Sequence, residues 1–161
     1  MANASKLVDN VLGGWQLNGI LTLRTGSPFT LGTNNCVGSF NGCTPDVVGN
    51  GDPKNAPAAG RSADRWFDTT AVTNPAPGTN GNLGIQSNNA PGQKYMDLSL
   101  FKGVNLTERV KIQFRAEAFN IANTPQYDRP NNTQGDPNFG RITGTQQGTQ
   151  RRTQFALRLM F

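Results

Sequence analysis

Few side chains in this sequence could carry out chemistry. None of the 161 residues is a histidine, which excludes a Ser-His-Asp or Cys-His catalytic unit and a histidine-ligated metal within the chain. Asp97 and Glu117 fall in different predicted strands, and nothing in the sequence fixes the distance between their carboxylates. We therefore predict no catalytic residue, no metal site and no cofactor, and we do not expect an enzyme.

The two cysteines, Cys36 and Cys43, are the remaining reactive groups. Two thiolates cannot complete a four-ligand structural zinc site, which leaves a disulfide, a redox pair or two unpaired thiols. The six residues between them are rich in Gly, Asn and Ser, a composition that suits a small loop closed by a disulfide. We expect the disulfide, which forms in oxidising compartments outside the cytoplasm.

The elements that position these residues are predicted to be strands and turns. Gly occupies 19 positions and Pro 10, and together with many Asn and Thr residues they favour turns and extended structure over helix. Hydrophobic residues make up only 35 %, which is low for a chain that buries its own core. The net charge of +5 comes without a basic stripe and interleaved aromatics, so no nucleic-acid partner is expected.

Four segments alternate apolar and polar residues with the period of two that is typical of a strand with one apolar face. The predicted strands span about 13–25, 94–102, 110–122 and 152–161. In the last strand the apolar side consists of Phe155, Leu157, Leu159 and Phe161. The charged residues on the polar sides of the four strands are Arg24, Asp97, Lys111, Arg115, Glu117 and Arg158. The sequence therefore predicts an all-β fold of about four long antiparallel strands.

The connections between these strands distinguish a soluble sheet from a membrane barrel. The segments at about 26–93 and 123–151 are long and rich in Asn, Gly, Pro and Thr, whereas the turn at about 103–109 is short. Outer-membrane barrels combine short periplasmic turns with long extracellular loops. Compact soluble domains seldom contain two such long loops without helical periodicity. We therefore expect part of a transmembrane β-barrel in the bacterial outer membrane, with both cysteines on the cell exterior.

An ordered series of motifs resembles the last strands of TonB-dependent receptors. The motifs are Gly-Gly-Trp-Gln-Leu-Asn-Gly-Ile (13–20), Thr-Gly-Ser-Pro-Phe-Thr (25–30), Asp-Leu-Ser-Leu-Phe-Lys (97–102), Leu-Thr-Glu-Arg (106–109), Gln-Phe-Arg-Ala-Glu-Ala-Phe-Asn (113–120) and Asn-Phe-Gly-Arg-Ile-Thr (138–143). The ending Gln-Phe-Ala-Leu-Arg-Leu-Met-Phe is similar to the C-terminal targeting strand of outer-membrane barrels. Within the family, the chain is most similar to Oar-like receptors that begin with a carboxypeptidase-regulatory-like domain.

This resemblance implies a parent barrel of about 22 strands, filled by an N-terminal plug domain, that takes up a bulky ligand with energy supplied through TonB. The chain would be the C-terminal fragment of that parent, and it would not transport alone because four strands leave two open edges. Its implied partners are the rest of the barrel, the plug, outer-membrane lipid and the barrel-insertion machinery, with TonB acting only through the missing N-terminal part. Phe161 would be periplasmic, and the polar sides of the strands would face the lumen.

The charged lumen side has two interpretations. It could grip the plug or guide an anionic ligand, or it could be a solvated wall whose charges pair locally, as Arg115 with Glu117. We expect the second, because exposed pairs contribute little and barrel lumens are generally polar.

Two other functions remain open for the whole chain. One is another outer-membrane barrel, such as a porin or an adhesin. The other is a soluble secreted β-sandwich that binds carbohydrate or protein, in which Trp66, Phe67 and Tyr127 would be the ligand-stacking aromatics of the loops. An upstream plug domain would separate the receptor from the porin, and a need for detergent would separate either of them from the sandwich.

Overall fold

The structure is a computed structural model that describes residues 8, 10–35 and 43–161. The chain divides into two compact units. The strand unit comprises Met1–Leu23, Lys94–Pro125 and Gln147–Phe161, and the loop unit comprises Arg24–Gln93 and Gln126–Gln146. Among the residues that the structure describes, none of the helices reaches the length and apolarity that crossing a membrane requires.

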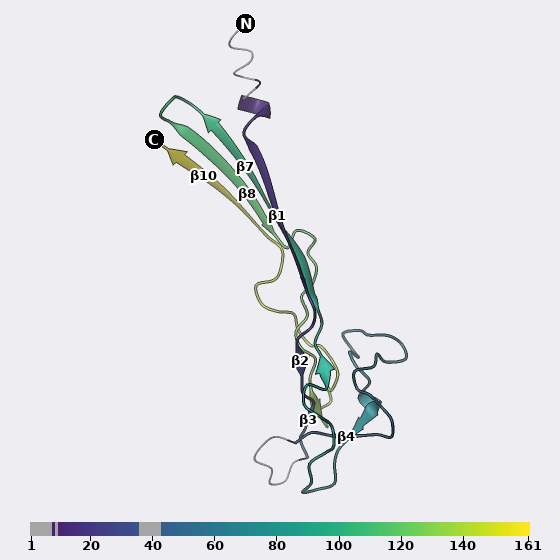
Figure 1. The fold of residues 1–161 in the computed structure, drawn as a ribbon. Coiled ribbons are helices and arrows are strands. Elements are labelled where there is room, and N and C mark those ends of the chain that lie inside the picture. The colour runs from purple at the N-terminus through teal and green to yellow at the C-terminus, as the bar shows by residue number, and fades with distance from the viewer. Residues whose placement is uncertain (1–7, 9, 36–42) are drawn as a thin grey trace. The chain divides into compact units, whose positions relative to one another are not determined.

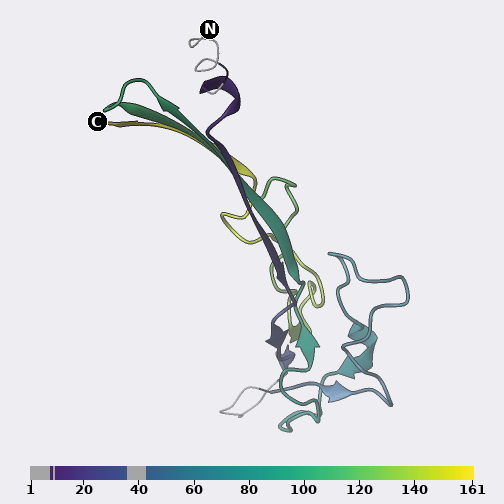
Figure 2. The same ribbon diagram turned by 45° about the horizontal axis from the view of Figure 1, so that its top comes forward.

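The strand unit is a four-stranded sheet in the order β1-β7-β8-β10. Its strands are β1 (Trp15–Arg24), β7 (Gln93–Asn105), β8 (Lys111–Phe119) and β10 (Arg152–Met160), of which only the end residues Arg24 and Gln93 belong to the loop unit. β8 pairs antiparallel with both β7 and β10. Gly103 N donates to Gly14 O at one end of β1, and Gly92 lies beside the Arg24 carbonyl at the other, so β1 and β7 also run in opposite directions. The four strands lie side by side in a curved sheet (Figures 1 and 2), which confirms the predicted all-β fold.

Strand boundaries differ from the prediction at the ends of β7 and β8. β7 continues beyond 102 because its pairing with β8 extends to Asn105 opposite Lys111. The connecting turn therefore shrinks to 106–110. β8 ends at Phe119 instead of 122, because Asn120 adopts a left-handed φ of 48° that a strand cannot continue through. The Asn120 side chain fixes this ending by donating to the carbonyls of Thr124 and Thr149, at 2.9 and 2.7 Å.

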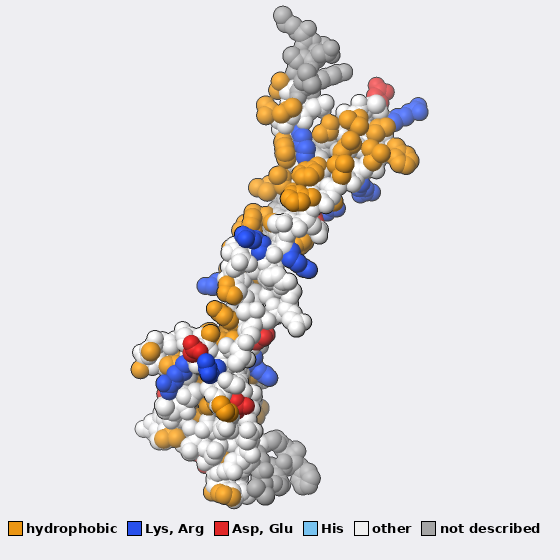
Figure 3. All heavy atoms as spheres, turned by 180° about the vertical axis from the view of Figure 1, so that it is seen from behind, with side chains coloured by type: hydrophobic (Ala, Val, Ile, Leu, Met, Phe, Trp, Pro, Cys, Tyr) orange, Lys and Arg blue, Asp and Glu red, His pale blue; other side chains and the backbone are white. Residues whose placement is uncertain are grey.

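The register gives the sheet one apolar face. Across β7, β8 and β10, Leu100 lies opposite Ala116, which in turn lies opposite Phe155. Phe155 also stacks on Phe114, with ring centroids 6.2 Å apart. The apolar side chains stay exposed, with Leu17 at 69 % and Leu157 at 71 % of full exposure. Hydrophobic side chains gather over the strands in Figure 3, so this face needs contact with something outside the described chain.

Lys102 is a cation within the apolar face, where it lies opposite Phe114. Its side chain is buried, and its Nζ donates to the carbonyls of Gly13 and, at 3.3 Å, Val11. The ammonium also lies 5.1 Å from the centroid of the Trp15 ring. The carbonyls and the ring face compensate the charge of Lys102, which forms no ion pair with an acidic side chain of the described residues.

The loop unit is held by three short ladders. β2 (Pro28–Phe29) pairs with β6 (Asn88–Asn89), β3 (Gly32–Thr33) with β9 (Thr133–Gln134), and β4 (Asp46–Val47) with β5 (Val72–Thr73). A 3-10 helix, η1 (Thr69–Ala71), precedes β5. Both long connections of the sheet contribute to this unit, since β9 lies in the second of them.

The loop unit has its own core, which consists of Phe29, Leu31, Phe67 and Val72. The Phe67 ring is fully buried and packs against the rings of Phe29 and Phe139, at 6.2 and 5.2 Å between centroids. The prediction that Phe67 stacks on a ligand in the soluble alternative is therefore wrong, because its faces are occupied by other aromatics. The indole of Trp66 is also held in place, because its Nε1 donates a hydrogen bond to Asn89 O at 2.8 Å.

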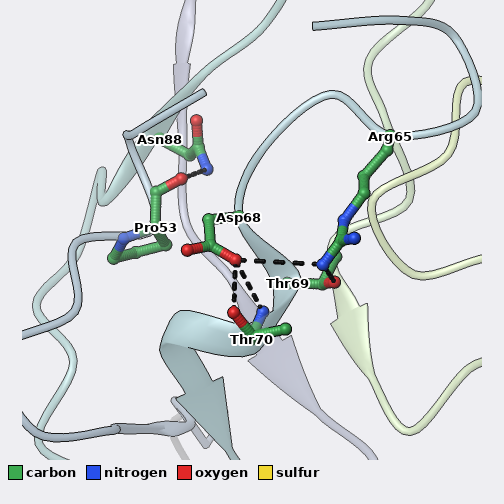
Figure 4. Close-up of polar contacts among 6 residues, drawn as sticks. All are labelled: Pro53, Arg65, Asp68, Thr69, Thr70 and Asn88. Carbon is green, nitrogen blue, oxygen red and sulfur yellow. Dashed lines mark hydrogen bonds and ion pairs between the residues drawn. The ribbon is translucent and has the colours of Figure 1, made fainter. Parts of the chain in front are cut away.

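Asp68 begins the 3-10 helix and shows how polar contacts order the loop unit (Figure 4). Its Oδ1 accepts hydrogen bonds from the Thr70 hydroxyl at 2.6 Å and the Thr70 backbone N at 3.0 Å. These two bonds hold the pKa of Asp68 below its usual value. Burial opposes this shift in part, and Arg65, 3.9 Å away, lowers the pKa by a smaller amount. Nearby, the buried Asn88 donates to Pro53 O at 2.9 Å.

Cys43 lies in the loop unit with 6 % of its surface exposed, and it is not a free thiol. Cys36 lies outside the described residues. The disulfide between them therefore stays a prediction.

Candidate functional site

The polar face of the strand sheet carries most of the charged residues selected from the sequence. Arg115 and Glu117 lie two residues apart on β8 and form an ion pair at 2.9 Å. The Arg115 guanidinium also lies 4.8 Å from the centroid of the Phe101 ring, its cross-strand neighbour on β7. Glu117 accepts a further hydrogen bond from Gln154 on β10. The local pairing expected for Arg115 and Glu117 is present, and it extends across three strands.

The other charged residues of this face lie toward its two ends. Lys111 is opposite Met160, and Arg158 is opposite Gln113, near the 106–110 turn. Within the described part of the chain, neither cation forms an ion pair. At the other end of β8, the Asp97 carboxylate accepts a hydrogen bond from Asn120 N at 2.8 Å.

A pocket of ≈ 180 Å³, called here the Phe119 pocket, lies at that same end of the strand sheet. Its walls include Tyr95, Asp97, Phe119, Asn120, Thr149 and Arg152. The Arg152 guanidinium lies 5.9 Å from the centroid of the Phe119 ring. Aromatic surface, a carboxylate and a guanidinium can bind a small polar group. The volume is below the roughly 300–1,000 Å³ of a pocket that encloses a whole small-molecule ligand.

Arg24 is separate from this group. It is the last residue of β1, and it lines a second pocket of ≈ 150 Å³ that lies wholly within the loop unit. We call this the arginine pocket, and its lining includes Arg24, Thr25, Ser27, Gln93, Tyr127 and Arg129. The structure thus brings Arg115 and Glu117 together and assigns Arg24 to a different site.

Sequence reasoning did not select Phe101, Phe119 or Asn120. Phe101 and Phe119 fall at alternating positions that belong to the polar face, so the strand period could have identified them as unusual aromatics beside the charges. No sequence signal pointed to Asn120, because its role depends on carbonyls of two separate segments.

The terminal strand presents Phe155, Leu157 and Leu159 as exposed side chains, and Phe161 follows it with 98 % of its surface exposed. β1 and β10 are the outer strands of the sheet. Each of them therefore has one edge that no strand of the described chain covers.

A family model described as an outer membrane beta barrel domain matches residues 1–154. The matched range contains β1, β7, β8, the start of β10 and both pockets. Comparison with curated proteins and with solved structures gave no significant match.

Proposed function

We propose that this chain, which belongs to the outer membrane β-barrel domain family, forms part of the barrel wall of a TonB-dependent receptor. The family places the chain in the bacterial outer membrane. The receptor assignment is finer than the family match, and it is supported by the ordered motifs that resemble the last strands of such receptors. The proposal includes no catalytic step and no cofactor.

The observation that carries the proposal is the two-faced sheet. One face exposes apolar side chains from all four strands, and the other carries the Arg115–Glu117 pair together with Asp97, Lys111 and Arg158. Moving one such side chain from water into an apolar phase contributes about 1.5–3 kcal/mol, so the exposed face favours lipid as its partner. A barrel supplies the missing neighbours of β1 and β10 as well, because lipid cannot satisfy an open strand edge.

In this arrangement, the charged residues of the polar face point into the lumen, where they contact water or the plug. These residues are Asp97, Lys111, Arg115, Glu117 and Arg158. The 106–110 turn and Phe161 lie on the periplasmic side, and the loop unit lies outside the cell. Arg24 belongs to the extracellular end. The Arg115–Glu117–Gln154 network favours a wall whose charges are paired locally over one that presents a free charge to a ligand.

TonB coupling is tested on the full-length native protein purified in detergent. The probe is the purified periplasmic domain of TonB, and binding is measured by titration. We expect saturable binding that disappears when the N-terminal TonB-contacting segment of the parent is deleted, while the barrel still shows heat-dependent mobility on gels. An assembled barrel with no affinity for TonB would contradict the receptor proposal and favour a porin or an adhesin.

The proposed role of the terminal strand in recognition by the insertion machinery has its own test. Phe161 ends the apolar face of β10, whereas Met160 lies opposite Lys111 on the polar face. Deleting Phe161, or the change Phe161→Asp, should lower the amount of assembled parent barrel much more than Met160→Gln does. The measurement is surface-exposed, heat-modifiable barrel per cell. Wild-type amounts after the deletion would show that this end does not close a barrel.

A further inference from the structure

The arginine pocket is built on backbone segments that approach very closely. Ala90 N donates to Ser27 O at 2.9 Å, which joins the segment after β1 to the segment before β7. A Cβ atom at Gly26 would lie 1.6 Å from Ala90 O, and one at Gly92 would lie 2.8 Å from Arg24 O. Only glycine permits both approaches, so the backbone that carries the lining residues Thr25, Ser27 and Ala90 is held in one arrangement. Gly26 belongs to the Thr-Gly-Ser-Pro-Phe-Thr motif, to which the barrel wall gives no role.

The walls of the pocket are also held in place. The Arg129 guanidinium lies 5.8 Å from the centroid of the Phe29 ring, which belongs to the core of the loop unit. Gln93 donates to the Gln146 side-chain oxygen at 2.6 Å, and Gln146 Nε2 donates to Tyr127 O at 3.2 Å. These contacts restrict the positions of Arg129, Gln93 and Gln146, three of the residues that line the pocket.

The lining is positively charged and is not neutralised. Arg24 and Arg129 contribute two guanidinium groups, and none of the residues that line the pocket is acidic. Neither arginine forms an ion pair with an acidic side chain of the described residues. Guanidinium groups are suited to two-point hydrogen bonding with anionic oxygens, so the pocket selects for an anion.

Charge and donor number favour one class of anion. A volume of ≈ 150 Å³ can accommodate one small ionic group together with water. The two guanidinium groups offer five N–H donors each, more than the roughly four acceptor positions of a single carboxylate. A phosphate monoester offers three terminal oxygens. We propose that the arginine pocket binds a phosphate group, carried by a soluble molecule or by a lipid headgroup. This inference does not depend on TonB coupling.

The test uses the full-length native protein in detergent, with inorganic phosphate as the probe and titration calorimetry at low salt as the measurement. Arg24→Gln and Arg129→Gln should each weaken binding about tenfold, the size expected when one charge-assisted contact is lost. The matched control is Arg61→Gln, which removes the same charge from the loop unit outside the pocket and should leave the affinity unchanged. Binding should also weaken as NaCl is raised. Heat-dependent gel mobility confirms that each variant is folded.

Two competitors separate the sources of the phosphate. Displacement of the probe by micelles of phosphorylated lipid A, and not by a soluble sugar phosphate, would assign the site to a headgroup of the outer leaflet. The reverse result would assign it to a soluble ligand. The proposal is overturned if folded wild-type protein does not bind millimolar phosphate, or if the Arg24→Gln/Arg129→Gln double variant binds it as tightly as wild type does.

Discussion

The strand unit and the loop unit differ in whether their apolar side chains are buried within the chain. The loop unit gathers Phe29, Leu31, Phe67 and Val72 into a core of its own, although its strands are only two residues long. The strand unit has long, regular strands and leaves Leu17, Leu157 and the other side chains of its apolar face exposed. Regular secondary structure and a buried core are therefore separate properties in this protein.

This difference accounts for the low hydrophobic content of 35 %. A sheet whose apolar face contacts lipid needs no second apolar layer from the chain itself, and its polar face can carry charges. In the proposed arrangement the loop unit lies in water, so its few aromatic residues must pack against one another. The two units should therefore respond differently to substitution, as these two kinds of environment require.

The largest effect is expected for Phe67→Ala in the loop unit. Removing a fully buried ring leaves a cavity, which lowers the free energy of unfolding by about 3–5 kcal/mol. The control is Phe155→Ala on the apolar face, where lipid chains can fill the space and no cavity term arises. Hydrogen exchange of the full-length protein should show loss of protection in the loop unit for Phe67→Ala only, with the barrel still heat-modifiable. Equal loss of loop-unit protection in both variants would remove the distinction between the two environments.

A smaller effect, about 2–4 kcal/mol, is expected for Leu157→Arg in the strand unit, because a guanidinium would enter the lipid region. Gln154→Arg is the matched control on the same strand, since position 154 lies on the polar face beside Glu117. The measurement is the yield of folded full-length barrel in liposomes. If both variants lose the same yield, the apolar face does not contact lipid.

The predicted disulfide should contribute about 2 kcal/mol to the loop unit, because the loop that it closes is short. Thiol labelling of unreduced, denatured full-length protein should find no free cysteine. The change Cys36→Ser should weaken protection of the loop unit and leave assembly of the strand unit unaffected. Two labelled thiols in exported wild-type protein would contradict this prediction.

The smallest effect concerns Asp68. Its hydrogen bonds to Thr70 lower its pKa in the folded state. The ionised carboxylate therefore stabilises the folded state above the unfolded pKa, and this stabilisation is lost as the pH falls through the folded pKa. The cap is exposed and belongs to a single turn, so we expect about 0.5 kcal/mol from it. As the pH falls from about 5 to about 2, protease resistance of the loop unit should decline more in wild type than in Asp68→Asn. Identical acid profiles for the two proteins would argue against this cap.

The sequence by itself determined the strands and their faces. Side chains alternate across a strand with a period of two, so neighbouring residues alone separate Leu157 from Arg158 and Phe114 from Arg115. The spacing between strands also indicated the long, short and long connections. These features are local along the chain, which is why they could be predicted, and the membership of an outer membrane β-barrel family agrees with them.

Only the tertiary structure decided which strand positions lie opposite one another and what the loops build. The register sets Phe101 against Arg115 and Glu117 beside Gln154, and a strand period carries no information about this offset. The core of the loop unit joins Phe29, Phe67 and Phe139, and the arginine pocket joins Arg24 to Arg129. Contacts between segments this far apart depend on how the loops close and pack, which no local pattern specifies.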